Sequence, residues 1–157
     1  MKIVIRPTYW TLHRERLSYA LEKMSYTSYV RGTQDEDAPL ETDCVTAVRW
    51  LLNASSDFFL PRAYIGDLPK ILMEMGCAIY PLHEAACGDL VFFEKMSLTH
   101  GKYMVNHMGL MISPEAFIHS SHKYQGSISR IDDREYIHSI LDESFLPLAR
   151  DPRNYQQ

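Results

Sequence analysis

The sequence predicts an α+β fold in which N-terminal helices pack on a central antiparallel sheet. In the first half of the chain, apolar residues recur at the three- and four-residue spacing of amphipathic helices. In the second half, short apolar runs alternate with turn residues, as is typical of antiparallel strands. Helices followed by strands favour separate α and β parts. Because 157 residues fit one domain and no linker interrupts them, we expect a single domain over residues 1–157.

Three helices are expected in the first half. The first covers residues 11–24 and presents one apolar face, formed by Leu17, Ala20, Leu21 and Met24. The second begins at Thr42 or Asp43, because either side chain can cap a helix N-terminus. The third begins after its cap Asp67 and ends just before Gly76. The acidic residues 35–37 are expected to form a solvated loop.

Short strands are expected in the second half. They are Ala78–Tyr80, Leu90–Phe93, His107–Ile112, Ala116–His119 and Ser127–Ile131. A short turn at residues 113–114 joins two of them, so these two are expected to be antiparallel neighbours. The segment 94–106 is longer than a hairpin turn needs, and it fits a flap beside a site as well as a solvent loop.

Composition and charge exclude several classes of protein. The net charge is −4, without the basic surplus of proteins that bind phosphate backbones, so no nucleic-acid partner is expected. No apolar run approaches the roughly 18 residues of a membrane span. The N-terminal residues 1–7 lack the apolar core and cleavage site of a signal peptide. We therefore expect the chain to be cytoplasmic at synthesis, or to be exported or released by a non-classical route.

An odd number of cysteines points to chemistry at a thiol. Cys44, Cys77 and Cys87 leave at least one thiol unpaired, and whether Cys77 pairs with Cys87 stays open. Cys44 lies at a predicted helix start, where the helix dipole and backbone N–H groups lower a thiol pKa. A nucleophilic thiolate also needs a proton carrier, usually histidine, and a polar group that orients it. A small buried side chain under a helix cap is the alternative for Cys44.

Four motifs in a fixed order carry a resemblance to a known family. They are Thr42-Asp43-Cys44, Gly88-Asp89-Leu90-Val91-Phe92-Phe93, Asn106-His107-Met108-Gly109-Leu110-Met111-Ile112 and Phe117-Ile118-His119-Ser120-Ser121. Together they resemble the NlpC/P60 family of papain-like cysteine peptidases, including the 12-residue spacing between the two histidines. The resemblance covers about residues 29–131 and implies a papain-like NlpC/P60 fold.

The resemblance also implies roles for five residues. Cys44 would be the nucleophile, His107 the general base, and His119 the residue that orients the His107 ring. Tyr29 would help to hold the oxyanion, together with the backbone N–H of Cys44. Asp43 would lie on the substrate side and meet a free amine of the substrate.

The implied activity is hydrolysis of a cell-wall peptide next to a D-γ-glutamyl bond to a diamino acid. It requires no metal or organic cofactor, and His83 with Cys77 and Cys87 does not match a zinc spacing. The partner is then a muropeptide; a delivered toxin would also need an immunity partner, for which the sequence gives no sign. Compared with the family pattern, Val45-Thr46 replaces Ser-Gly, and Thr33 replaces a second Gly.

Two other functions stay compatible with these residues. One is an acyl-transferase or amidase of the same fold that acts on a lipid or a protein, which the Val45-Thr46 replacement keeps open. The other is a non-catalytic binding module. The presence of all three catalytic residue types argues against the second.

Overall fold

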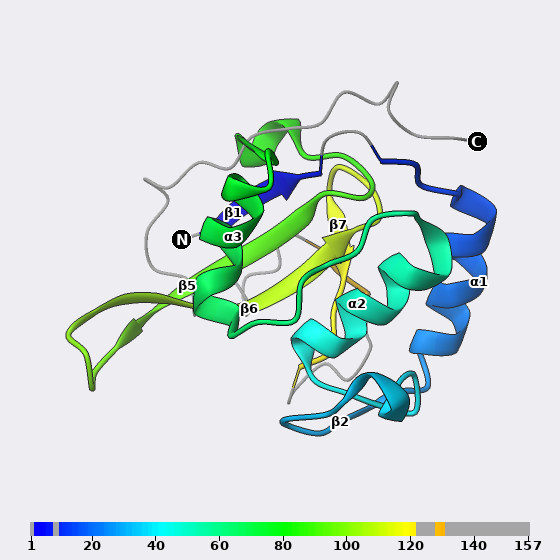
Figure 1. Ribbon diagram of the computed structural model, residues 1–157, viewed down its shortest axis with the longest axis horizontal. Coiled ribbons are helices and arrows are strands. Elements are labelled where there is room, and N and C mark those ends of the chain that lie inside the picture. Colours follow the sequence, from blue (N-terminus) through cyan, green and yellow to red (C-terminus); the bar gives the residue numbers. More distant parts are fainter. Residues whose placement is uncertain (1, 8–9, 122–127, 131–157) are drawn as a thin grey trace.

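The computed structural model describes residues 2–7, 10–121 and 128–130, and its elements confirm the α+β class (Figure 1). The helices in these ranges are α1 (Arg14–Met24), α2 (Cys44–Ser55) and α3 (Leu68–Glu74). The strands are β1 (Lys2–Arg6), β2 (Ser28–Tyr29), β3 (Glu41–Thr42), β4 (Ala78–Tyr80), β5 (Leu90–Ser97), β6 (Lys102–Met111), β7 (Ala116–Ile118) and β8 (Ile128–Arg130). Of the last expected strand, residues 127 and 131 lie outside the described ranges.

The start of α2 follows directly from local sequence signals. Asp43 takes the N-cap position, and its carboxylate accepts the backbone N–H of Thr46 at 2.8 Å. This bond satisfies one of the N–H groups that a helix N-terminus leaves unpaired. The cap therefore sets Cys44 as the first helical residue, as the sequence predicts.

Within the described ranges, six strands form one antiparallel sheet in the order β4-β1-β5-β6-β7-β8. Strand β1, which lies between β4 and β5, is not among the strands expected from the sequence. Its apolar run Ile3-Val4-Ile5 is too short to distinguish a strand by periodicity. The strands β2 and β3 form a separate parallel pair next to the start of α2.

The segment 94–106 is an extension of the sheet, not a loop or a flap. Strands β5 and β6 continue through it and leave only residues 98–101 as the turn. Figure 1 shows the tip of this hairpin projecting beyond the rest of the sheet. The pairing changes from Phe93 with His107 to Glu94 with Val105, so Asn106 is the extra residue of a β-bulge. Bulges bend a strand and re-aim its side chains, and they are frequent beside active sites.

The sheet has two differently packed faces. The helices cover one face, where Val48 and Leu51 of α2 share a buried cluster with Phe92 and Met108 of the sheet. A smaller cluster on the other face includes Val91, Phe93, Met111 and Phe117. Because side chains alternate along a strand, His107 and its cross-strand partner Phe93 lie on this second face.

Candidate functional site

A cleft of about 650 Å³ opens at the N-terminus of α2. Its walls come from Tyr29 and residues 31–34, the start of α2, residues 62–65, and Asn106 in the β6 bulge. Cys44, Asp43 and Tyr29 all line it. Ligand sites usually enclose about 300–1,000 Å³, so the cleft is large enough for part of a peptide. Three of the five residues singled out in the sequence thus share one concave site.

The other two residues, His107 and His119, meet across β6 and β7. Nε2 of His107 and Nδ1 of His119 lie 2.8 Å apart, and both side chains are buried. One ring therefore donates a proton to the other. Phe93 packs on the His107 ring and Phe117 on the His119 ring, with centroids 5.6 and 4.6 Å apart. The prediction that the two rings meet across adjacent strands is confirmed.

Gly109 lets strand β7 approach β6 at this point. A Cβ atom on Gly109 would lie 2.8 Å from Cδ2 of Phe117 and 2.9 Å from the carbonyl oxygen of Ile118. It would also lie 3.3 Å from Cβ of His119. Because the backbone oxygen cannot rotate away, the close approach requires a residue without a side chain.

Gly109→Ala is expected to push β7 away and separate the two imidazole rings. Overpacking of this kind costs typically about 1–3 kcal/mol in the free energy of unfolding. Urea denaturation measures this loss, and ¹⁵N spectra of the histidine rings report the hydrogen bond. Gly66→Ala is the matched control, because its Cβ would meet the exposed, movable ring of Tyr64. Equal destabilisation by the two variants would contradict the role given to Gly109.

The surroundings of Cys44 favour the thiol over the thiolate. Burial, followed by the negative charge of Asp43, raises the pKa of Cys44 to about 12. Backbone N–H groups of Met108, Val45 and Cys44 itself favour the thiolate, but they do not outweigh these two effects. The expectation of a pKa lowered by the helix N-terminus is therefore wrong, because desolvation of the sulfur exceeds the effect of the dipole.

The environment of His107 favours the neutral imidazole. Burial, followed by the charge of His119, lowers the pKa of His107 well below its ordinary value. A neutral imidazole can accept a proton, which is what a general base requires. One of the backbone groups that favour the Cys44 thiolate belongs to Met108, the residue that follows His107. At rest, Cys44 is therefore a protonated thiol and His107 an unprotonated imidazole.

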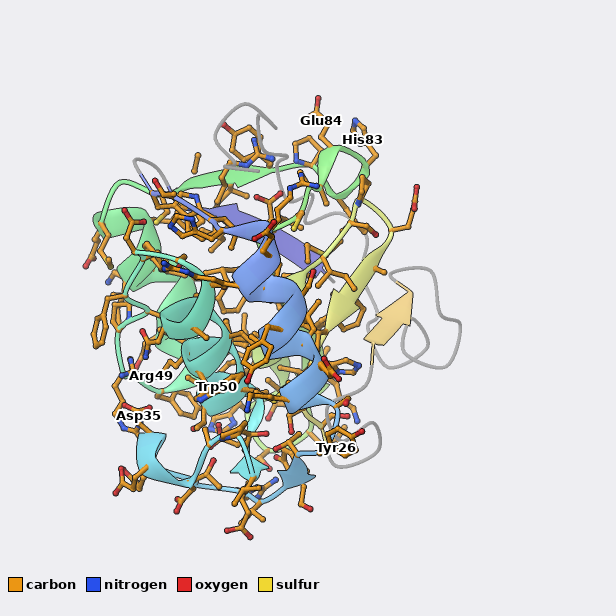
Figure 2. All side chains as sticks on the ribbon, turned by 90° about the vertical axis from the view of Figure 1, so that its right-hand side faces the viewer. Tyr26, Asp35, Arg49, Trp50, His83 and Glu84 are labelled. Atoms are coloured by element: carbon orange, nitrogen blue, oxygen red, sulfur yellow. The ribbon has the colours of Figure 1, made fainter. Side chains whose placement is uncertain are left out.

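An ion-pair network supports one wall of the cleft. Arg49 of α2 donates to both carboxylate oxygens of Asp35, and the two side chains lie side by side in Figure 2. Arg62 donates to Asp35, to the carbonyl of Thr33 and to Oε1 of Gln34. The hydrogen bond from Arg49 is the main cause that lowers the pKa of Asp35. The expectation of a solvated acidic loop is wrong for Asp35, because its carboxylate pairs with Arg49 of α2 and with Arg62.

Two replacements of family glycines, Thr33 and Thr46, contact each other beside Asp43. The Thr46 hydroxyl donates to the Thr33 carbonyl at 3.1 Å. The Thr33 hydroxyl accepts the backbone N–H of Asp43 at 2.8 Å. This connection was not predicted from the sequence, and neither were Arg62 and Asn106 as cleft residues. The only signal in the sequence was that both threonines stand where glycine was expected.

Other candidate chemistry is not assembled in the described part of the chain. No group of three or more His, Cys, Asp or Glu side chains there could hold a metal ion. Cys77 and Cys87 are buried thiols, not joined by a disulfide. In Figure 2, His83 lies at the opposite end of the molecule from Asp35. Within the same residues, no helix has the length and apolar character needed to span a membrane.

Comparison with known proteins gives a matching family and a solved structure of the same fold. A model of the NlpC/P60 family matches residues 26–143. A crystal structure from Staphylococcus aureus, described as similar to lipoprotein and of the NLP/P60 family, has 19% sequence identity and a TM-score of 0.57. The match covers 82% of this chain but only 39% of that one, and it shows a shared fold. No curated protein matches this chain.

Proposed function

Because this chain belongs to the NlpC/P60 family, whose members are typically cysteine peptidases, we propose that it hydrolyses an amide bond with Cys44 as the nucleophile. The observation that carries the proposal is the arrangement of the cleft. Cys44 lines it at the start of α2, together with Asn106 of β6, the residue directly before His107. His107 is in turn bonded to His119.

In the proposed reaction, His107 removes the thiol proton as sulfur attacks. The Sγ–carbon bond forms while the proton moves to Nδ1 of His107, and Nε2 stays bonded to His119. The backbone N–H of Cys44 and the Tyr29 hydroxyl stabilise the oxyanion. The C–N bond then breaks, and His107 returns its proton to the leaving amine. Water, deprotonated by His107, hydrolyses the thioester to a carboxylic acid and restores the thiol.

The proposed substrate is a cell-wall stem peptide, cleaved between D-γ-glutamate and a diamino acid. The charges of the cleft support a substrate that carries both carboxylates and an amine. Arg31 and Arg62 line it and can pair with carboxylates, and Asp43 can pair with an ammonium group. Val45 also lines it, so an apolar side chain faces the place where the family has a hydroxyl.

Digestion of purified muropeptides tests both nucleophile and substrate. We expect wild-type protein to release two fragments, identified by mass spectrometry, and Cys44→Ala to release neither. The loss should exceed about 10³-fold, because no other group replaces the nucleophile. Cys87→Ala is the control, since Cys87 is a buried thiol outside the cleft.

Other outcomes of this digestion would point to the two alternative functions. If muropeptides stay intact while a lipid ester or a protein amide is cleaved in a reaction that requires Cys44, the substrate is a lipid or a protein. A Cys44 that forms no acyl-enzyme with any of these substrates would instead favour a binding module.

A further inference from the structure

Three buried hydroxyl groups connect the two halves of the candidate site. The Thr42 hydroxyl lies 2.7 Å from that of Thr27 and 2.9 Å from that of Ser120. The Ser120 hydroxyl lies 3.1 Å from the Thr42 carbonyl oxygen. Thr42 and Ser120 are fully buried and Thr27 is 4% exposed, so water does not compete for these bonds.

The positions of the protons in this cluster follow from counting. A hydroxyl carries one proton and accepts up to two hydrogen bonds. Ser120 donates to the Thr42 carbonyl, and Thr42 donates to the Ser120 oxygen. Thr27 therefore donates to Thr42. The bonds between Thr42 and Ser120 run in both directions, and we call this reciprocal pair the clasp.

The clasp joins the two segments that carry the reacting groups. Thr42 is the last residue of β3, directly before the Asp43 cap and Cys44. Ser120 directly follows His119, although it lies 78 residues from Thr42 in sequence. Thr42 is therefore two residues from Cys44, and Ser120 is one residue from His119.

We propose that the clasp positions Cys44 relative to the His107–His119 pair. Apolar side chains would fill the same space, but they would allow the segments to slide, whereas hydrogen bonds have a preferred distance and angle. An error of about 1 Å in the placement of reacting groups can cost about 10²-fold in rate. Thr42 and Ser120 are thus positioning residues, and their catalytic consequence rests on the proposed function.

A pair of substitutions at residue 42 separates hydrogen bonding from packing. Thr42→Val keeps the shape of the side chain and removes the hydroxyl, whereas Thr42→Ser keeps the hydroxyl and removes a methyl group. We expect Thr42→Val to lower kcat by about 10–100-fold with little change in KM. We expect Thr42→Ser to stay within about threefold of wild type, as a conservative rescue. Initial rates on muropeptides measure both parameters.

Spectra of the histidine rings test the clasp without any substrate. We expect Thr42→Val, but not Thr42→Ser, to shift the ring ¹⁵N signals of His107 and His119. Unchanged signals in Thr42→Val would overturn the proposal, and so would equal losses of kcat in the two variants. If wild-type protein cleaves no substrate, the proposed function fails on that result, and the ring signals still decide whether the clasp holds the histidines.

Discussion

Replacement of His107 by glutamine is expected to lower kcat/KM for amide hydrolysis by about 10²–10⁴-fold at pH 7. Because burial and the charge of Asp43 raise the pKa of Cys44 to about 12, the thiol is protonated at that pH, and the nucleophile depends on a base. Glutamine keeps a polar group next to His119 but cannot take up the proton. Initial rates with the substrate identified by digestion measure the loss.

The pH profile of this reaction distinguishes a neutral resting pair from an ion pair. Because the pKa of His107 is lowered, its imidazole stays unprotonated at pH values below 6.5, the ordinary pKa of histidine. The wild-type rate should therefore fall only at more acidic pH. Because the pKa of Cys44 is raised, no alkaline decline is expected up to about pH 10. The His107→Gln rate should instead rise about tenfold per pH unit, since hydroxide must remove the proton. A wild-type rate that falls above about pH 8 would indicate a thiolate–imidazolium pair instead.

His100→Gln provides the control for this series. His100 lies exposed in the turn of the β5–β6 hairpin, where its ring bonds to Ser97. We expect wild-type kinetics from this variant at every pH. A His107→Gln protein with more than a tenth of the wild-type rate would remove His107 from the proposed mechanism.

A buried ion pair between Arg6 and Asp89 is expected to have the largest effect on stability. Nε and Nη2 of Arg6 lie 2.9 and 3.1 Å from the two Asp89 oxygens, and the side chains are 2% and 0% exposed. The guanidinium group also stacks on the Tyr80 ring, 3.7 Å from its centroid. Asp89 accepts the backbone N–H of Ala86 as well. This pair ties β1 to β4 and to the turn before β5.

Arg6→Met is expected to lower the free energy of unfolding by about 3–5 kcal/mol. The variant leaves the Asp89 carboxylate buried without its counter-ion, which costs more than the ion pair itself contributes. The double variant Arg6→Met, Asp89→Leu should recover part of this loss, because it removes both charges. Urea denaturation measures each value, with exposed Lys70→Met as a control expected within about 0.5 kcal/mol of wild type. A loss below about 1 kcal/mol for Arg6→Met would contradict this account.

The elements that could be predicted from the sequence are those with local signals. Asp43 predicts the start of α2 because an N-cap side chain bonds to a backbone N–H only three residues further along the chain. His107 and His119 could be paired because a short turn fixes the register of β6 and β7. The placement of Cys44 at a helix start followed from the same cap.

The elements that could not be predicted depend on distant parts of the chain. Strand β1 is defined by partners in β4 and β5, and the bond from Arg6 to Asp89 spans 83 residues. The predicted direction of the Cys44 pKa shift was wrong. A helix start can be recognised from the local sequence, whereas the burial that raises this pKa arises from tertiary packing.

The central place of β1 has a consequence for how the chain folds during its synthesis. Strand β1 is synthesised before both of its neighbours, β4 and β5, and its partners in β5 extend to Phe93. At about 5–20 residues per second, the ribosome needs about 5–20 s to reach that point. Throughout this interval, both edges of an apolar segment stay open to wrong pairing. Because β1 is central, we expect the large sheet to assemble only after β4 and β5 have been synthesised.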